Sequence, residues 1–294
     1  MTDKIDTIRS MDLWTGAVEV EPLHGGLSNE SFAVTDGDQR YVVRFGRDFP
    51  FHHVSREREV MITRAAFQAG FAPELVHAEP GVMVSRFIQA YTYTEADVQA
   101  DCAALADLVR RFHQTMPTHV SGQATIFWVF HVIRDYARML IEANHRYAGR
   151  CGDWLALSAR LEALQVPLPI VFGHHDLLAA NFLKDERRLW LIDFEYAAYG
   201  TAMFDLAGLA SNSRLDRGQS ADLLRAYFGA PASSDIVRSH AAMQAASLLR
   251  EAMWSMVSEM HLDTPGVDYV AYSDEQLDRL DRCLHSHAAD FGAP

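Results

Sequence analysis

The sequence is poor in cysteine and in positive charge. It has three cysteines, at positions 102, 151 and 283, and no Cys-x-x-Cys pair. An odd number without such spacing argues against a disulfide framework. Lys and Arg total 26 against 39 Asp and Glu, which gives a formal net charge of −13. Because proteins that bind nucleic acid usually carry a basic patch, we expect no nucleic-acid partner. The negative charge also disfavours an anionic membrane surface and suits a cationic small molecule.

Long apolar runs are missing as well. The longest apolar stretches, such as 126–133, are much shorter than the roughly 18 residues that a membrane-spanning helix needs. The N-terminal segment MTDKIDTIRSMDLW lacks the apolar core of a signal peptide. We therefore expect a soluble protein of the reducing cytoplasm that makes no membrane contact. The sequence gives no indication of the oligomeric state.

Composition and length indicate a globular chain of about two domains. Apolar residues make up 49% of the 294 residues and charged residues 22%, close to the globular average. A chain of this length fits two domains of roughly 100–200 residues each. The first part predicts the order β-β-β-α-β-β, with strands at 17–22, 31–35, 41–45, 74–79 and 82–88 and a helix from Ser55 to Gly70.

The pattern becomes helical after position 89. Apolar residues recur there at helical spacing, as in Leu105, Leu108, Val109 and Phe112. A further helix is expected over 126–147, short buried strands at 170–172 and 189–192, and helices over most of the last third. We therefore predict an α+β fold with a small β-rich N-terminal domain, 1–89, and a larger, mostly helical C-terminal domain, 90–294.

Polar side chains surround the two short strands of the second domain. The loop after the first of them carries His174 and Asp176, Asn181 follows Asp176 by five residues, and Asp193 ends the second. We expect Asp176, Asn181 and Asp193 to converge because they follow adjacent strands. Phosphoryl transfer needs this set: one carboxylate orients the acceptor hydroxyl and takes its proton, while an Asn oxygen and a second carboxylate hold Mg²⁺.

Two other interpretations of this segment are open. His174, His175 and Asp176 are residue types that bind zinc, as in a metal-dependent hydrolase. The polar residues could also be the turn, cap and surface residues of an ordinary loop. The order of strands and polar residues favours phosphoryl transfer over both.

The N-terminal part offers candidate phosphate ligands. Between two predicted strands, the backbone at Gly26 could cover phosphates, with Ser28 and Asn29 donating hydrogen bonds. Arg44 lies on an otherwise apolar strand, and a buried charge without a partner is costly. Two candidate partners lie in the helix that follows: Glu57 and Glu59.

A tryptophan near the C-terminus is a candidate cation site. In the expected helix 245–260 the apolar stripe is Leu249, Ala252, Met253, Met256 and Met260. Trp254 lies off this stripe and shares a polar face with Glu251. A Trp beside a carboxylate suits a bound cation, and Tyr269 or Tyr272 could complete an aromatic cage. The alternative is that Trp254 packs against another helix.

The sequence resembles the aminoglycoside phosphotransferase and choline kinase superfamily, and most of all its choline/ethanolamine kinase branch. The similar motifs lie between about residues 20 and 282: HGGLSNE at 24–30, YVVR at 41–44, H-x-D-x-x-x-x-N at 174–181, IDFEY at 192–196, FDLA at 204–207, AMW at 252–254 and VDYVAY at 267–272. The resemblance implies the bilobal protein-kinase fold and transfer of phosphate from ATP, with Mg²⁺, to choline or ethanolamine. The alternatives are another alcohol (an aminoglycoside, thiamine, methylthioribose or homoserine) and an inactive kinase fold that only binds.

The resemblance also implies roles for single residues. Asp176 is the base, Asn181 and Asp193 hold Mg²⁺, and Arg44 binds phosphate and pairs with Glu59 rather than Glu57. The other implied nucleotide contacts are Gly26, Ser28, Asn29, Arg86 and Ile88, and the implied acceptor contacts are Glu195, Glu251, Trp254 and Tyr272.

Three positions qualify this assignment. Glu195 could assist a second metal ion. Glu251 stands where eukaryotic members carry a second Trp, and His175 stands where Asn is usual. A carboxylate at position 251 would still favour a cationic acceptor.

Overall fold

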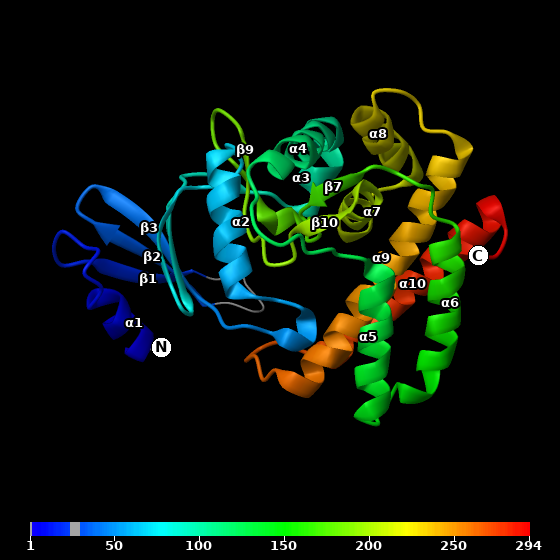
Figure 1. Cartoon of the computed structure of the whole chain (residues 1–294), viewed down its shortest axis with the longest axis horizontal. Coiled ribbons are helices and arrows are strands. Elements are labelled where there is room, and N and C mark those ends of the chain that lie inside the picture. Colours follow the sequence, from blue (N-terminus) through cyan, green and yellow to red (C-terminus); the bar gives the residue numbers. More distant parts are fainter. Residues whose placement is uncertain (1, 24–29) are drawn as a thin grey trace. The chain divides into compact units, whose positions relative to one another are not determined.

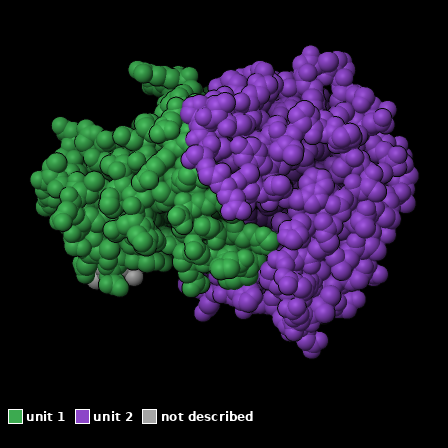
Figure 2. All heavy atoms as spheres, in the orientation of Figure 1, with its two compact units in different colours: residues 1–92, 182–195 green, residues 93–181, 196–294 purple. Residues whose placement is uncertain are grey.

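The computed structural model of the chain describes residues 2–23 and 30–294. It divides into two compact units, which we call unit 1 (Met1–Thr92 and Phe182–Glu195) and unit 2 (Tyr93–Asn181 and Tyr196–Pro294) (Figure 1, Figure 2). This division differs from the single boundary expected at residue 89. The difference arises because the hairpin 182–195 rejoins the first unit after the chain has already entered the second.

Unit 1 is built on an antiparallel sheet with the strand order β1-β2-β3-β5-β4. Its strands are β1 (Glu19–Leu23), β2 (Glu30–Asp36), β3 (Gln39–Phe45), β4 (Leu75–Glu79) and β5 (Val82–Arg86). In the β2–β3 hairpin Asp36 pairs with Gln39, and Gly37 has a φ of 58°, a conformation that favours glycine. The predicted succession of these five strands along the chain is confirmed.

The helix predicted after Ser55 is α2 (Arg56–Gln68). Ser55 is its N-cap, and the Ser55 side chain accepts a hydrogen bond from the Arg58 amide. This bond satisfies one of the backbone donors that the start of a helix leaves unpaired. Gly70, with a φ of 82°, follows the end of the helix.

A helix before the first strand, α1 (Thr2–Arg9), is not predicted by the sequence. Ile5 and Ile8 are too few apolar residues to give a helical pattern. In the structure Ile8 is fully buried against sheet residues that include Phe32 and Val43. Packing on the sheet therefore stabilises a helix that is too short to be stable alone.

The short strands in the middle of the chain form two small sheets. They are β6 (Tyr91–Thr92), β7 (Ile170–Gly173), β8 (Phe182–Lys184), β9 (Leu189–Leu191) and β10 (Ala198–Thr201). One sheet is β6-β8-β9 and the other is β10-β7. The expectation that Asp176 and Asp193 follow adjacent strands is therefore wrong, because β7 and β9 belong to different sheets. Strands of three or four residues carry too little pattern to identify their partners.

Unit 2 is mostly helical. Its helices are α3 (Glu95–Ala100), α4 (Cys102–Thr115), α5 (Val129–Glu142), α6 (Cys151–Ala163), α7 (Ala202–Asn212), α8 (Arg217–Phe228), α9 (Ser234–His261) and α10 (Tyr269–Phe291). Short 3₁₀ turns cover Met116–Thr118, Ala148–Arg150 and Ala179–Asn181 in this unit, and Pro50–His52 in unit 1. The long helix α9 packs against α5, α6, α7 and α10 (Figure 1). Within the described residues, no helix combines the length and apolar character needed to cross a bilayer.

Helix α5 is shorter than the predicted span of 126–147. Before it, the Phe127 amide donates to the Tyr199 carbonyl at 2.8 Å, so this part of the chain lies extended beside β10. After it, Asn144 adopts a φ of 51°, which ends the helix. Backbone pairing at one end and a left-handed residue at the other therefore set its length.

Candidate active site

A buried aspartate holds the loop that carries Asp176. Asp205, in the first turn of α7, accepts hydrogen bonds from the amides of His174 at 2.8 Å and His175 at 2.6 Å. The His113 ring Nε2 lies 2.8 Å from the same carboxylate. Burial opposes the charge on Asp205, but the hydrogen bond with His113 holds its pKa well below the usual range. The sequence analysis missed the role of Asp205. The available signal was an acidic residue in the otherwise apolar first turn of a helix.

His175 is a packed side chain within this loop. It has a φ of 63°, and its ring stacks on Phe127 with centroids 4.6 Å apart. A Cβ at Gly173 would lie 2.4 Å from His175 Nε2, and one at Gly200 would lie 2.8 Å away, so both glycines make room for the ring. Burial lowers the pKa of His175 to about 4, which leaves the ring neutral at pH 7.

The zinc interpretation gains no support from this geometry. Asp205 binds the backbone amides of both His174 and His175. Within residues 2–23 and 30–294, His, Cys, Asp and Glu side chains form no group of three arranged to hold a metal ion.

Asp176 and Asn181 lie together at the end of the loop. Asn181 Nδ2 donates to the Asp176 carbonyl at 2.8 Å and to Asp176 Oδ2 at 3.2 Å. Asn181 lies in the 3₁₀ turn Ala179–Asn181 and is buried. Because its amide nitrogen binds Asp176, the atom that Asn181 can offer to a metal ion is Oδ1.

In unit 1, Arg44 on β3 joins two carboxylates. It forms an ion pair with Glu59 of α2, and its Nη1 donates to Asp193 Oδ1 at 2.8 Å. Glu59 is fully buried, and a buried carboxylate needs such a partner. The pairing of Arg44 with Glu59 rather than Glu57 is as predicted. Asp193 follows β9 with a φ of 65°.

A second arginine, Arg56, extends this network. Its Nη1 lies 2.6 Å from Glu59 Oε2 and 2.9 Å from Glu195 Oε2. Glu195 is buried, and burial together with the Asp193 charge raises its pKa. The sequence analysis placed Glu195 at the acceptor or a second metal; in the structure its carboxylate binds Arg56. The role of Arg56 was missed because an arginine in the first turn of a helix gives no local signal.

The structure describes only some of the other residues expected to contact the nucleotide. Gly26, Ser28 and Asn29 lie outside the described residues. The Arg86 amide donates to the Glu74 carbonyl at 2.8 Å, and its guanidinium binds Gln39 Oε1 at 2.7 Å. Ile88, just beyond β5, is half-buried. A cavity of about 610 Å³ in unit 1 is lined by four arginines: Arg44, Arg47, Arg56 and Arg64.

In unit 2, Trp254 lies in an aromatic cluster. Its Nε1 donates to the Tyr196 hydroxyl at 3.0 Å, and its ring meets Tyr269 and Tyr272 edge-on, with centroids 6.2 and 6.4 Å away. The polar face that it shares with Glu251 is largely buried, and its contacts with Tyr269 and Tyr272 of α10 agree with the alternative that Trp254 packs against another helix. Trp254 is 8% exposed, and Ser247 and Ser258, which should share that face, are buried too. Helix α9 is covered on nearly every side, because it runs between four other helices.

Glu251 and Tyr272 are joined as part of the same cluster. The Tyr272 hydroxyl donates to Glu251 Oε1 at 2.8 Å, and Arg250 Nη1 donates to Glu251 Oε2 at 2.8 Å. The Arg250 guanidinium is buried and lies 4.6 Å from the centre of the Tyr196 ring. Arg250 therefore compensates the negative charge of Glu251, which the sequence analysis expected to attract a cationic acceptor. Asp176, Arg250 and Glu251 line one small cavity.

Comparison with known proteins places this arrangement in a family. The sequence pattern of the "Phosphotransferase enzyme family" matches residues 19–242, and the chain therefore belongs to that family. It is similar to the protein LicA of Haemophilus influenzae, 23% identical over 69% of this chain and 61% of LicA. It is also similar to a probable ethanolamine kinase of Arabidopsis thaliana, 27% identical over 64% of this chain and 54% of that protein. The matched part thus spans little more than half the length of these curated relatives.

Solved structures share the whole fold. A choline/ethanolamine kinase family protein from Mesorhizobium loti matches with a TM-score of 0.75 and 27% identity, over 98% of both chains. Choline kinase LicA from Streptococcus pneumoniae matches with a TM-score of 0.77 and 22% identity, over 97% of this chain and 99% of that one. The predicted kinase-like fold, with a β-rich N-terminal portion and a mostly helical remainder, is confirmed.

Proposed function

We propose that this protein is an ATP- and Mg²⁺-dependent kinase that phosphorylates the hydroxyl group of an amino alcohol, with choline or ethanolamine as the acceptor. The observation that carries the proposal is the pairing of Asp176 with Asn181 on a loop held by Asp205. In kinases the carboxylate of such a loop orients the acceptor hydroxyl and the Asn serves the metal ion. Relatives named as choline and ethanolamine kinases support this acceptor class.

In the proposed reaction Asp176 accepts the hydrogen bond of the acceptor hydroxyl. As the bond from the acceptor oxygen to the γ-phosphorus forms, the bond to the ADP oxygen breaks and the proton passes to Asp176. Arg44 would offset the negative charge of a phosphate group, since a guanidinium can donate hydrogen bonds to two phosphate oxygens at once. The network with Glu59 and Asp193 fixes the direction in which its guanidinium points.

The residues present fit a magnesium ion in their chemistry. Asn181 offers Oδ1, and Asp193 offers the carboxylate oxygen that does not accept from Arg44. Hard oxygen donors in small number are what Mg²⁺ takes from proteins, with phosphates and water completing the shell. The bound ion would neutralise charge on the transferred phosphate.

For the acceptor we propose the aromatic cluster of unit 2. Trp254 and Tyr272 offer ring faces to an ammonium group, and Glu251 adds a carboxylate that Tyr272 and Arg250 hold in place. Because Arg250 compensates Glu251, the rings would contribute more to cation binding than the carboxylate does.

The test is ADP release with ATP and a panel of alcohols: choline, ethanolamine, thiamine, homoserine, methylthioribose and an aminoglycoside, each with and without Mg²⁺. We expect turnover with choline or ethanolamine that needs Mg²⁺. A higher kcat/KM for another alcohol would overturn the acceptor assignment. Nucleotide binding without turnover of any alcohol would identify an inactive kinase fold. Asp176→Asn should abolish the signal, while Asp263→Asn, at an exposed position after α9, should leave it unchanged.

A further inference from the structure

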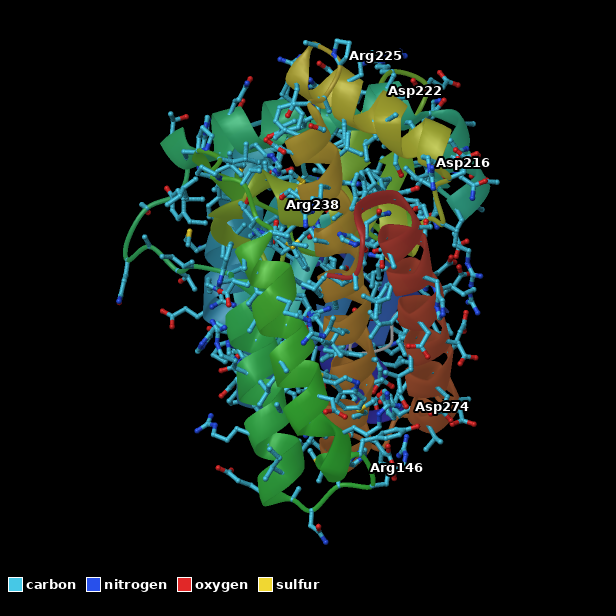
Figure 3. The ribbon with its side chains drawn as sticks, turned by 90° about the vertical axis from the view of Figure 1, so that its right-hand side faces the viewer. Arg146, Asp216, Asp222, Arg225, Arg238 and Asp274 are labelled. Carbon is cyan, nitrogen blue, oxygen red and sulfur yellow. The ribbon has the colours of Figure 1, made fainter. Side chains whose placement is uncertain are left out.

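A second cavity lies in unit 2, among the end of α7 and helices α8, α9 and α10, and its lining does not include the Asp176 loop. Its volume is about 720 Å³, within the range of small-molecule sites. Leu215, Leu224, Val237 and Leu248 give it an apolar lining. Figure 3 shows this side of the molecule, with Asp216 at the start of α8.

The polar lining of this cavity is cationic in a chain whose net charge is −13. It contains four arginines and two acids: Arg214, Arg217, Arg279, Arg282, Asp216 and Asp290. Both acids are already engaged. Asp216 caps α8 by accepting from the Gln219 amide, and Asp290 binds Arg217 at 2.6 Å. Arg214 pairs with Glu95 and Glu275, which lie outside the lining. The remaining positive charge of the lining is therefore that of Arg279 and Arg282.

Two of these arginines lack a carboxylate within ion-pair distance, as far as the described chain extends. Arg279 binds the Gln276 side chain and the Ser211 carbonyl, which are both neutral. Burial and the nearby charge of Arg214 lower the pKa of Arg279. Arg282 is exposed on the next turn of α10. An oxyanion would supply the acceptor oxygens that these guanidinium groups lack.

A buried histidine supplies a further polar atom. His240 on α9 is 2% exposed, and burial lowers its pKa to about 4, so the ring is neutral. The Leu206 backbone is hydrogen-bonded to the ring, and Nε2 has no partner among the described residues. Because Nε2 has no partner, we assign the hydrogen bond with Leu206 to Nδ1 as its donor, which leaves Nε2 of the neutral ring as an acceptor. Buried polar atoms are normally hydrogen-bonded. A bound molecule with a hydrogen-bond donor would supply the partner that Nε2 lacks.

We propose that this cavity binds a small organic oxyanion, a carboxylate or a phosphomonoester, that also carries a hydroxyl or ammonium donor. Arg279 and Arg282 bind the anionic group, His240 Nε2 accepts from the donor, and the leucines contact the carbon skeleton. None of the residues that line this cavity belongs to the Asp176 loop or to the Arg44 network, although Arg279 lies close enough to Tyr272 of the proposed acceptor cluster to influence its pKa.

The test is calorimetric titration of the full chain with three probes: citrate, O-phosphoethanolamine and inorganic phosphate. We expect either citrate or O-phosphoethanolamine to bind more tightly than inorganic phosphate, which lacks the carbon skeleton and the second donor. Which of the two binds distinguishes the carboxylate from the phosphomonoester. Binding of inorganic phosphate alone, or of no probe at millimolar concentration, would overturn the proposal.

Two substitutions locate the binding. Arg282→Glu should weaken it by about tenfold to a hundredfold, the range for losing a hydrogen bond to a charged group. Arg238→Glu is the matched control, because Arg238 is an exposed arginine of α9 outside the cavity (Figure 3), and it should leave affinity unchanged. His240→Leu should weaken the binding of citrate or O-phosphoethanolamine, each of which carries a hydrogen-bond donor for Nε2. Equal affinity in wild type and Arg282→Glu would assign the binding to another site, such as the phosphotransfer site, and would overturn the proposal.

Discussion

Arg44 Nη1 and Asp193 Oδ1 lie 2.8 Å apart although 149 residues separate them in the sequence. The contact joins the central strand β3 of unit 1 to the segment that follows β9, and the same guanidinium holds Glu59 of α2. One side chain therefore positions a carboxylate proposed to bind metal and ties it to the sheet. A lysine would have to make both contacts from one nitrogen, whereas the guanidinium makes them from two, Nη2 to Glu59 and Nη1 to Asp193.

Replacing Arg44 should separate its proposed role in nucleotide binding from its role in stability. We expect Arg44→Lys to fold but to bind MgATP more weakly, and Arg44→Met to lose about 3–5 kcal/mol of stability, as when one partner of a buried pair is removed. Urea unfolding and nucleotide titration measure the two effects. A double-mutant cycle with Asp193→Asn should give a coupling energy of about 0.5–3 kcal/mol. A coupling energy of zero would show that the contact between Arg44 and Asp193 contributes nothing to stability.

Asp176 should matter for turnover and little for folding. Asp176→Asn keeps the shape and removes the proton acceptor, so we expect kcat to fall by about 10²–10⁴-fold. Unfolding and nucleotide titration should give values close to wild type. Near-normal kcat in this variant would remove Asp176 from the role of base.

Asp205 is a positioning residue, and its loss should affect both loop geometry and stability. The His174 and His175 amides donate to different oxygens of Asp205. Asp205→Asn keeps one of these acceptors, replaces the other with an amide nitrogen that cannot accept, and removes the charge. Hydrogen bonds to charged groups contribute about 1.5–3 kcal/mol each, so we expect a comparable loss of stability. kcat should fall while KM for ATP changes little. The matched control is Asp222→Asn, because Asp222 is exposed and pairs with Arg225 of the same helix (Figure 3). A loss of kcat there as large as in Asp205→Asn would argue against the positioning role.

Trp254 should contribute to packing as well as to any acceptor contact. Trp254→Ala should cost about 3–5 kcal/mol, the usual range for truncating a large buried aromatic residue. Trp254→Phe should cost less, because it loses mainly the hydrogen bond to Tyr196. Under the proposed function, the Phe variant should raise KM for choline about two- to fivefold and KM for uncharged 3,3-dimethylbutanol less. Equal increases would show that the ring provides only packing.

The buried His175 predicts how stability depends on pH. Its pKa is about 4 in the folded chain and about 6.5 when exposed, so between these values the unfolded chain binds a proton that the folded chain does not. Stability is therefore complete above about pH 6.5 and falls as the pH is lowered toward 4, by up to about 1.4 kcal/mol per pH unit.

A substitution isolates the contribution of this histidine. His175→Asn tolerates the positive φ and should flatten the pH dependence measured by urea unfolding between pH 7 and 5. His285→Asn, at an exposed position, should leave it unchanged. Parallel curves for wild type and His175→Asn would contradict the prediction.

The sequence alone determined the features that depend on near neighbours in the chain. The spacing of Asp176 and Asn181 within one loop, the Ser55 cap and the succession of the first five strands along the chain all follow from local patterns. A charged residue on an apolar strand needs a partner, which left Glu57 and Glu59 of the next helix as candidates for Arg44; the family resemblance then implied Glu59. A motif with fixed spacing also carries its resemblance to a family.

Only the tertiary structure decided the features that depend on distant partners. The sheet membership of β7 and β9, the anchoring of the loop by Asp205 and the burial of Trp254 rest on contacts between segments far apart in the chain. Helix α9 appears one-sided by its apolar periodicity, yet four helices surround it, so its serines and Trp254 are buried as well. Burial and pairing are properties of the assembled core, and no local pattern encodes which neighbour covers a given face.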